Sequence, residues 1–262
     1  MAEPDRHLAV AVEATRAAGA LLRERFGPPQ QVEYKGESDL VTALDRQAET
    51  LVVGHLRAAF PDHTVLAEEG STGGGDPVHR WLVDPLDGTT NYAHGYPCFA
   101  VSVAYERAGQ VVVGVVYDPL RDELFTAEAG RGAWLNGQPL RVSPTGRLIE
   151  SLLITGFPYE RARLPAALRL WNALIVRAQA LRRDGAAALD LCYVAAGRAD
   201  GFWERPLQPW DMAAGALIVA EAGGHVSSFA GGPLDVYSGQ IVATNSAIHA
   251  ELLAAIAAAE GR

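Results

Sequence analysis

The stretch WLVDPLDGTTN at residues 81–91 is the part of the sequence that most constrains how this chain can fold. Its first, apolar residues predict the end of a buried strand, and Pro85 cannot donate a hydrogen bond that would continue a strand ladder. We therefore expect Asp84 and Asp87 to lie on a turn directly after the strand. Gly88 allows the backbone to approach a ligand closely. The threonines that follow can open a helix, whose unpaired N–H groups attract anions.

Two carboxylates on such a turn are suited to a magnesium ion. Carboxylates are hard oxygen donors of the kind that Mg²⁺ prefers, and a turn held rigid by Pro85 can aim the carbonyl of Leu86 at the same ion. An Asp-Gly turn with a threonine cap is also common in proteins that bind no metal. Asp-Gly-Thr alone therefore favours neither interpretation, and the acids elsewhere in the chain decide between them.

Two further acidic regions flank this stretch at a distance in the sequence. Upstream lie DLVTALD at residues 39–45 and VLAEEG at residues 65–70, and downstream lie Glu204 and the segment PWDMAAGA at residues 209–216. Each acid alone could be a solvated side chain or a helix cap, as Asp211 near a helix start illustrates. Together with residues 84–91, in the same order and with similar spacing, they resemble the inositol monophosphatase family. The resemblance covers most of the chain.

The resemblance implies Mg²⁺ as the cofactor, with two or three ions. Glu68, Asp84 and the carbonyl of Leu86 resemble the ligands of a first ion. Asp84, Asp87 and Asp211 resemble the ligands of a second. Several carboxylates packed together would repel one another without these ions, so a metal site is the natural use of such a cluster.

The resemblance also implies roles in catalysis and substrate binding. Glu68 and Thr89 match residues that position and activate a water molecule, and Asp45 matches an acid that pairs with this threonine and helps to hold a weaker ion. Lys35 lies near the position of a family lysine, one residue closer to the acids, and we leave it out of the core site. The implied substrate-binding residues are Asp87, Gly88, Thr89, Gly185, Ala186, Ala187, Glu204 and Asp211.

The fold that the resemblance implies is of the α/β (α+β) class, a layered αβαβα sandwich of the inositol monophosphatase and fructose-1,6-bisphosphatase type. Hydrophobic periodicity in the sequence predicts helices over residues 4–26, 42–60, 164–180, 186–196, 211–222 and 247–259. It predicts strands at 81–83, 99–106, 111–117, 123–127, 152–155 and 201–204, with turns at Ala108-Gly109 and Asn136-Gly137 and a loop at residues 73–75. The pattern restarts after residues 143–146, which predicts an N-terminal subdomain, 1–145, and a C-terminal subdomain, 146–262, that contributes Glu204 and Asp211.

Composition sets outer limits on the class of protein. With 262 residues and 49% hydrophobic content, the chain can bury a large core. A net charge of −9 argues against a general binder of nucleic acids or membranes. Cys98 and Cys192 lie in apolar surroundings, so we expect no disulfide framework and a reducing, cytoplasmic location, without a signal peptide or membrane span. The resemblance implies a homodimer.

The expected activity is Mg²⁺-dependent hydrolysis of a small phosphate monoester, with inositol monophosphate as the first candidate and with lithium sensitivity. Histidinol phosphate, fructose 1,6-bisphosphate and a nucleotide 3′-phosphate are alternative substrates of the same chemistry. Any of the arginines beside the site could select a second anionic group on the substrate; the candidates are Arg161, Arg163, Arg177, Arg182 and Arg183.

Two other classes of function compete with this one. A phosphatase of the haloacid-dehalogenase type would use Asp84 as a covalent nucleophile, but such enzymes place their aspartates two positions apart, whereas Asp84 and Asp87 are three apart. A non-catalytic relative that only binds a phosphorylated ligand would have no use for the complete set of acids together with Thr89. Both alternatives therefore leave part of the pattern unexplained.

Overall fold

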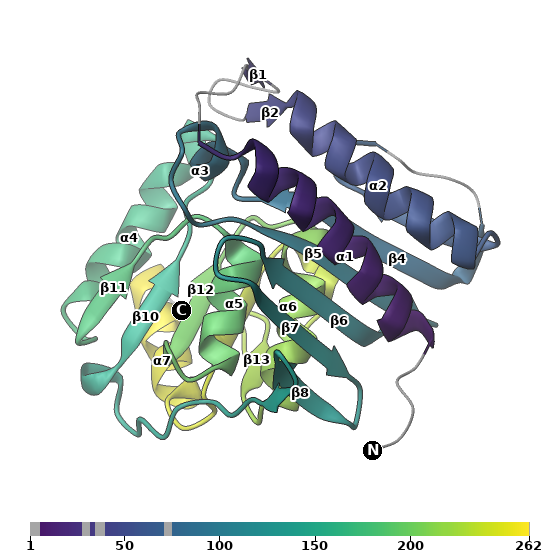
Figure 1. The fold of residues 1–262 in the computed structure, drawn as a ribbon. Helices are drawn as coiled ribbons and strands as arrows, with labels where there is room; N and C mark the ends of the chain where they lie inside the picture. The colour runs from purple at the N-terminus through teal and green to yellow at the C-terminus, as the bar shows by residue number, and fades with distance from the viewer. Residues whose placement is uncertain (1–5, 28–31, 35–39, 71–74, 262) are drawn as a thin grey trace.

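Two large β-sheets and three pairs of helices stack in five layers in the part of the chain that this computed structural model describes, residues 6–27, 32–34, 40–70 and 75–261 (Figure 1). Lys35 and most of the glycine loop at residues 73–75 lie outside these ranges. A short antiparallel pair, β1 (Val32–Tyr34) and β2 (Leu40–Thr42), stands apart from the two large sheets.

The first large sheet has seven strands in the order of the sequence. It consists of β3 (His63–Ala67), β4 (Asp76–Asp87), β5 (Ala100–Arg107), β6 (Gln110–Asp118), β7 (Glu123–Glu128), β8 (Gly132–Leu135) and β9 (Gln138–Pro139). Only β3 and β4 run parallel, and tight hairpins join later strands. Ala108 and Gly109 have φ of 52° and 79°, and Asn136 and Gly137 have φ of 48° and 77°, which confirms both predicted turns.

The second sheet has five strands and a different pattern of connections. Its strand order is β11 (Ala180–Arg182), β10 (Leu152–Thr155), β12 (Gly201–Glu204), β14 (Ile241–Thr244) and β13 (His225–Ser227). The strand β10 runs parallel to both of its neighbours, and β14 runs antiparallel to both of its own. All of these strands come from residues after 151, whereas the first sheet ends at Pro139. The division of the chain into subdomains 1–145 and 146–262 stays a prediction.

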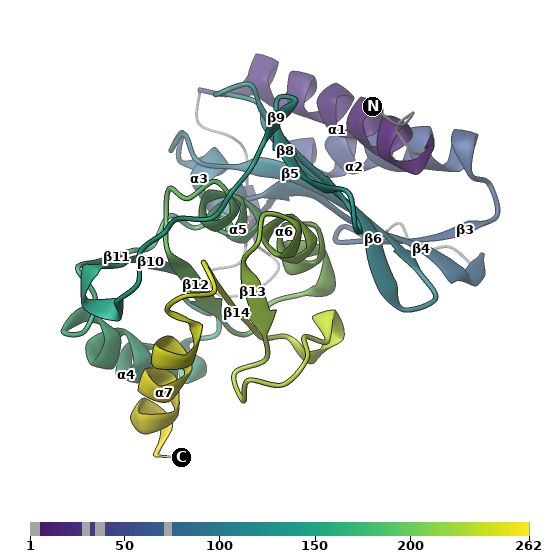
Figure 2. The same ribbon diagram turned by 90° about the horizontal axis from the view of Figure 1, so that it is seen from below.

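The helices fill the three remaining layers (Figure 2). The helices α1 (Arg6–Arg25) and α2 (Ala43–Ala59) pack on one face of the seven-stranded sheet. The helices α5 (Ala187–Ala195) and α6 (Pro209–Glu221) lie between the two sheets and are apolar over most of their circumference, as burial on both sides requires. The helices α4 (Leu164–Ile175) and α7 (His249–Glu260) cover the outer face of the second sheet. The αβαβα sandwich expected from the sequence is therefore confirmed.

The middle layer approaches the first sheet closely at a glycine. A Cβ atom on Gly114, in the centre of β6, would stand only 2.8 Å from the carbonyl oxygen of Ala214 on α6. Glycine is thus required where the helix backbone crosses the strand. Nearer the acids, the hydroxyl of Ser102 on β5, which pairs with Asp84, donates to the carbonyl oxygen of Trp210 at 3.1 Å and holds the beginning of α6 close to the end of β4.

The strand that leads into these acids continues further than the sequence predicted. We expected it to end at Val83 and to be followed by a turn, but β4 continues to Asp87. Asp84 and Asp87 both pair with β5, and the two residues between them, Pro85 and Leu86, face a single residue of that strand. Such a bulge leaves its extra residue outside the hydrogen-bonded ladder, so proline is tolerated there.

One predicted helix was too long. The apolar pattern over residues 164–180 predicts a single helix, but α4 ends at Ile175. The backbone N–H of Gln179 then donates to the carbonyl of Ser151, 2.9 Å away, and turns the chain so that β11 can pair with β10. Periodicity alone cannot separate a helix from a short apolar strand that follows it.

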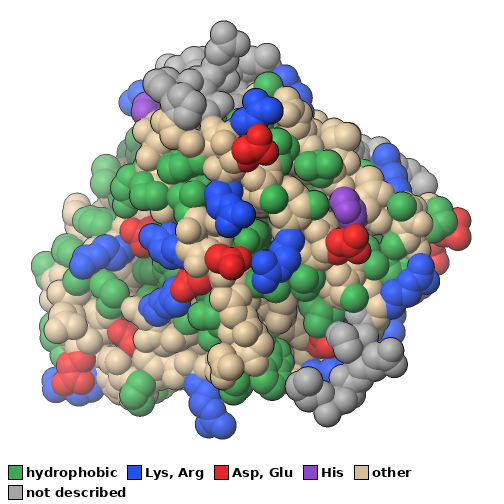
Figure 3. Space-filling view, viewed as in Figure 1, with side chains coloured by type: hydrophobic (Ala, Val, Ile, Leu, Met, Phe, Trp, Pro, Cys, Tyr) green, Lys and Arg blue, Asp and Glu red, His purple; other side chains and the backbone are tan. Residues whose placement is uncertain are grey.

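The surface carries charges of both signs. On the face seen in Figure 3, Lys and Arg side chains are interspersed with Asp and Glu, so that face has no continuous basic stripe. Of the helices that the structure describes, none combines the length and the apolar character that crossing a bilayer requires.

Candidate active site

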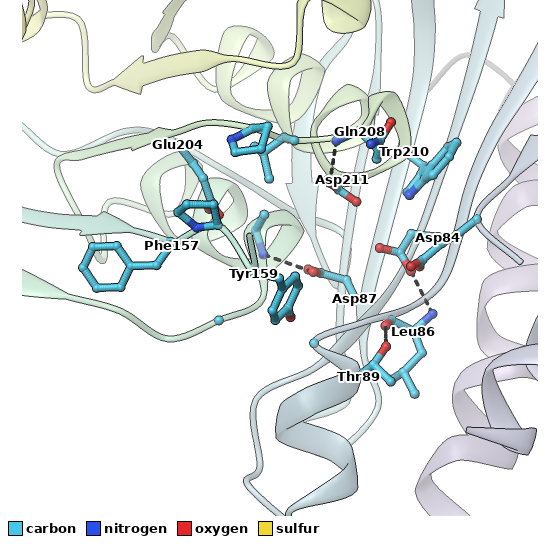
Figure 4. A pocket seen from close by; sticks show the side chains of 18 of the residues that line it. Asp84, Leu86, Asp87, Thr89, Phe157, Tyr159, Glu204, Gln208, Trp210 and Asp211 are labelled. Carbon is cyan, nitrogen blue, oxygen red and sulfur yellow. Dashed lines mark hydrogen bonds between the residues drawn. The ribbon is translucent and has the colours of Figure 1, made fainter. Parts of the chain in front are cut away.

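One cavity of about 270 Å³ collects most of the residues that the sequence singled out. It opens at the end of β4, between the beginnings of α5 and α6 and the segment that follows β10 (Figure 4). The predicted site residues that line it are Glu68, Asp84, Leu86, Asp87, Gly88, Thr89, Gly185, Ala187, Glu204 and Asp211. Asp45 and Ala186 are buried beside the cavity and do not line it.

The bulge in β4 aims its two aspartates in different directions. The Asp84 carboxylate accepts a hydrogen bond from the backbone N–H of Leu86 at 3.0 Å. The Asp87 carboxylate accepts from the N–H groups of Ala187 and Ala188 at 3.1 and 2.8 Å. Asp87 therefore joins the end of the first sheet to the first turn of α5, where unpaired N–H groups favour a negative charge.

The short helix α3 (Thr89–Ala93) follows the bulge and confirms the helix start expected after Gly88. Gly88 has φ of 94°, and a Cβ atom on it would stand 2.9 Å from the carbonyl oxygen of Cys98. The Asn91 side-chain amide donates to the carbonyl oxygens of Cys98 and Asp184, each at 2.8 Å. These contacts hold the segment around Gly185 against the residues that follow β4.

Thr89 connects the cavity to an acid on α2. Its hydroxyl lies 2.8 Å from Oδ1 of Asp45 and 3.0 Å from the carbonyl oxygen of Leu86. A hydroxyl has one hydrogen, so it donates to only one of these acceptors at a time. The side chain of Asp45 is 1% exposed and belongs to the first turn of its helix. Asp45 therefore orients the Thr89 hydroxyl from a buried position next to the cavity.

Two further acids reach the cavity from the second half of the chain. Asp211 accepts a hydrogen bond from the backbone N–H of Gln208 at 2.7 Å and completes a capping box at the beginning of α6. The capping role considered for Asp211 is therefore present together with its place in the cavity wall. Glu204 is the last residue of β12, and its carboxylate lies against Gly156.

Burial and mutual repulsion raise the pKa values of these acids. Burial is the largest cause for Asp84, whose pKa is raised further by Glu68, Asp87 and Asp211. Burial also raises the pKa of Asp87 to about 7, although the hydrogen bonds that Asp87 accepts from backbone N–H groups lower it. The pKa of Asp211 is raised by burial and then by Asp87, Glu68 and Glu204. Burial raises the pKa of Glu204 to about 8.

This set of oxygen atoms suits a hard divalent cation. Carboxylates and a backbone carbonyl are the ligands that Mg²⁺ takes, and a cation among the acids would relieve the repulsion that raises their pKa values. Within the described ranges, no three His, Cys, Asp or Glu side chains are arranged as they stand to hold a metal ion. The acids therefore fit a metal by chemistry and position, and side-chain rotation would complete its coordination.

The structure places one of the candidate arginines at the cavity and adds residues for which the sequence predicted no role. Of the five arginines considered, Arg183 lines this cavity, and its charge lowers the pKa of Glu204 against the effect of burial. Tyr159 and Trp210 also line the cavity. Trp210 directly precedes Asp211, so sequence proximity could have indicated it.

Asp190 on α5 is a second addition. Both of its carboxylate oxygens are buried and have no hydrogen-bond partner among the described residues. Burial raises its pKa well above the usual value, and Glu204, Asp184 and Asp87 raise it further. Its position one helical turn after Ala186 was the signal in the sequence that could have identified it.

The five layers and the acid-lined cavity define a mixed α/β protein with a candidate site for a phosphate ester and divalent cations. A sequence model described as the inositol monophosphatase family matches residues 3–261. The chain belongs to the inositol monophosphatase family, and it is a phosphoric monoester hydrolase.

Individual relatives agree with this assignment. The chain is 49% identical over 254 residues to an inositol-1-monophosphatase of Synechocystis sp., covering 96% of this chain and 88% of that one. It is 46% identical over 251 residues to the Nus factor SuhB of Escherichia coli, covering 94% of each. Among solved structures, an inositol monophosphatase from Anabaena superposes with a TM-score of 0.87 at 44% identity, covering 95% of this chain and 94% of that one.

Proposed function

We propose that this phosphatase hydrolyses inositol monophosphate to inositol and phosphate, with Mg²⁺ as the metal and water as the nucleophile. The observation that carries the proposal is the convergence of acids from three distant parts of the chain. Glu68 follows β3, Asp84 and Asp87 lie at the end of β4, and Asp211 begins α6, yet all four line one cavity. Separate solvated acids or helix caps would have no reason to meet there.

Two sets of ligands are available for two ions. Glu68, Asp84 and the carbonyl of Leu86, which all line the cavity, would form the first set, and Asp84, Asp87 and Asp211 would form the second. A third, weaker ion would be held with the help of Asp45. When bound, Mg²⁺ would supply neutralisation of the phosphate oxygens, a lowered pKa for the attacking water and stabilisation of the leaving oxygen.

The chain's own residues orient the nucleophile. When Thr89 donates its hydrogen to Asp45, the lone pairs of its hydroxyl oxygen are free to accept a hydrogen bond from a water molecule. Glu68 lines the same cavity, and its carboxylate is suited to receive a proton from that water. Glu68 and Thr89 thus form the proposed catalytic pair, with Asp45 as the residue that fixes the direction of the Thr89 hydroxyl.

The substrate's alcohol would be bound on the opposite side of the phosphate. Glu204 and Asp211 offer acceptor oxygens for hydroxyl groups, and the backbone at Gly88 and at 185–187 lies beside them. Because an inositol ring carries hydroxyls on every side, several acceptors around one small cavity suit it well. This is the basis for choosing inositol monophosphate as the first substrate.

Phosphate release from purified protein tests this proposal. We expect hydrolysis of inositol 1-phosphate with Mg²⁺, loss of activity after chelation, recovery when Mg²⁺ is restored, and inhibition by Li⁺. Full activity in excess chelator would contradict the metal role. If kcat/KM for histidinol phosphate or fructose 1,6-bisphosphate is well above that for inositol 1-phosphate, the enzyme hydrolyses that alternative substrate by the same mechanism.

The proposed partners are a small phosphorylated polyol and a second copy of the chain, with a cytoplasmic location. The prediction that no nucleic acid binds rests on the net charge of −9. Some relatives are named Nus factor SuhB. That name hints at an association with transcription, which does not fit the prediction that no nucleic acid binds. Size measurement in solution would test the homodimer.

A further inference from the structure

A second cavity of about 440 Å³ adjoins the candidate active site. Three residues line both cavities: Gly156 after β10, and Glu204 and Pro206 at and after the end of β12. The two spaces therefore lie on either side of the Glu204 side chain. The proposed function gives no role to the second, larger space.

The second cavity lies along one face of α4. Ala166, Ala167 and Leu170 line it, with spacings that place them on one face of the helix. Trp203 and Phe229 also line it, and each of these residues is only 3% exposed. Larger residues at 166 and 167 would reduce this space, which the two alanines leave open.

The two arginines that line this cavity are already paired. The guanidinium of Arg163 pairs with Glu160, and that of Arg205 pairs with Glu260 and lies over the Phe229 ring, 4.7 Å from its centroid. Because each cation has a carboxylate partner within the chain, the cavity offers no free positive charge to a second phosphate. Thr155, Ser238 and Gln240 add polar groups to the lining, and the rest of it is apolar and partly aromatic.

We propose that this cavity is a second subsite for the leaving group, and that it binds an aromatic or branched alkyl extension of the esterified alcohol. The proposal rests on the proposed function, which places the phosphate in the neighbouring cavity. A leaving group long enough to extend past Glu204 would donate a hydrogen bond from a hydroxyl to that carboxylate. Its apolar end would then lie between Trp203 and the alanines of α4. The substrate class is thus a phosphate monoester of an alcohol with an apolar extension.

Chain-length selectivity of the wild-type protein is the first test. Butyl phosphate and 4-phenylbutyl phosphate differ only in the ring that the subsite would receive. Because full burial of such a ring is favourable, we expect kcat/KM with Mg²⁺ to be at least about tenfold higher for 4-phenylbutyl phosphate. Equal values for the two esters would overturn the proposal.

Filling the cavity is the second test. Ala167→Leu, with Ala166→Leu as a second variant in case the first misfolds, should lower kcat/KM for 4-phenylbutyl phosphate about tenfold. Values for butyl phosphate and inositol 1-phosphate should stay within about twofold. Asn172→Leu is the matched control, because it adds the same side chain at an exposed position of α4 outside the cavity. Unchanged selectivity in both alanine variants would overturn the proposal.

Binding of the alcohol separates failure of the subsite from failure of the proposed function. Calorimetric titration with 4-phenylbutanol requires no hydrolysis, and we expect saturable binding that Ala167→Leu weakens and Asn172→Leu does not. If inositol 1-phosphate is not hydrolysed but the alcohol binds in this way, the proposed function fails and the apolar pocket stands. If the alcohol does not bind, and sedimentation shows that Ala167→Leu changes only the oligomeric state, the cavity is a contact between copies of the chain.

Discussion

The carboxylate of Glu204 occupies the space in which a side chain on Gly156 would begin. A Cβ atom on Gly156 would overlap both carboxylate oxygens of Glu204. Glu204 is the last residue of β12, and Gly156 directly follows β10. Because these two strands are parallel neighbours, the sheet fixes the two backbones side by side. The absence of a side chain at 156 therefore sets the position of Glu204 between the two cavities.

Gly156→Ala should displace Glu204 and weaken substrate binding. We expect KM for inositol 1-phosphate to rise about tenfold, equivalent to about 1.4 kcal/mol, with a much smaller change in kcat. Glu204 can move because its carboxylate is the far end of a flexible side chain, so the fold should persist. Steady-state kinetics with a thermal melt checks this. Gly146→Ala is the control, since a Cβ atom there meets open space.

Rescue distinguishes positioning from general damage. In the double variant Gly156→Ala with Glu204→Asp, the shorter side chain withdraws its carboxylate from residue 156, and KM should recover part of the loss. A KM that stays at the wild-type value in Gly156→Ala would show that the location of Glu204 does not matter for binding.

Asp87→Asn should abolish turnover while leaving the protein folded. The amide can accept one of the two hydrogen bonds from Ala187 and Ala188, so the junction with α5 is partly kept. The negative charge proposed to hold a cation is lost, and we expect kcat to fall by a factor of at least about 100. Asp122→Asn, an exposed aspartate in an ion pair with Arg16, serves as the matched control. Near-normal phosphate release by Asp87→Asn would remove Asp87 from the mechanism.

The sequence predicted much of this arrangement because its signals are local. Gly88 and Thr89 open α3 as expected, and the strands from residue 99 to residue 128 alternate clearly. The error at Val83 arose because Pro85 excludes a regular ladder but not a bulge. Which acids share a cavity was implied by the family resemblance, since no local pattern reports the distance between residues 68 and 211.

Contacts between distant segments lay beyond sequence patterns. Gly156 is an unremarkable residue in the sequence, and its relation to Glu204 depends on the parallel pairing of two strands. Asp190 looks like an ordinary helix residue until the second sheet and α6 bury it. The second cavity likewise depends on how α4 packs, and periodicity overestimated the length of that helix.

Asp190→Asn should stabilise the metal-free protein at neutral and alkaline pH. The folded chain raises the pKa of Asp190 above its ordinary value of 3.8, so above about pH 4 the unfolded chain releases a proton that the folded chain retains. The contribution of Asp190 to stability is fully present below the unfolded pKa and is lost as the pH rises through the folded value. Asparagine has no such titration.

Urea unfolding in chelator at pH 4 and pH 8 measures this effect. The gain in unfolding free energy of Asp190→Asn over wild type should increase with pH, by at most about 1.4 kcal/mol per pH unit. The acids of the cavity titrate in both proteins, so the difference reports on Asp190. A difference that does not change with pH would show that burial does not shift this carboxyl.

Magnesium should stabilise the wild-type protein, and more strongly at pH 8 than at pH 6. The pKa of Asp87 is raised to about 7, and an aspartate must lose its proton before it can bind a cation, so affinity should rise as the pH passes through this value. A ligand that binds only the folded state at 100 times its Kd adds about 2.7 kcal/mol to stability. Thermal melts with and without Mg²⁺ at the two pH values measure the gain.

Asp211→Asn decides whether this stabilisation comes from the cavity. Asparagine preserves an acceptor for the Gln208 N–H and thus the cap of α6, but it removes a charge from the acid cluster. We expect the rise in Tm with Mg²⁺ to shrink in this variant and to persist in Asp122→Asn. Because metal-free stability falls as the pH rises through the raised pKa values of the acids, Mg²⁺ should also flatten the pH dependence of the wild type. An equal rise in Tm for all three proteins would mean that Mg²⁺ acts elsewhere on the surface.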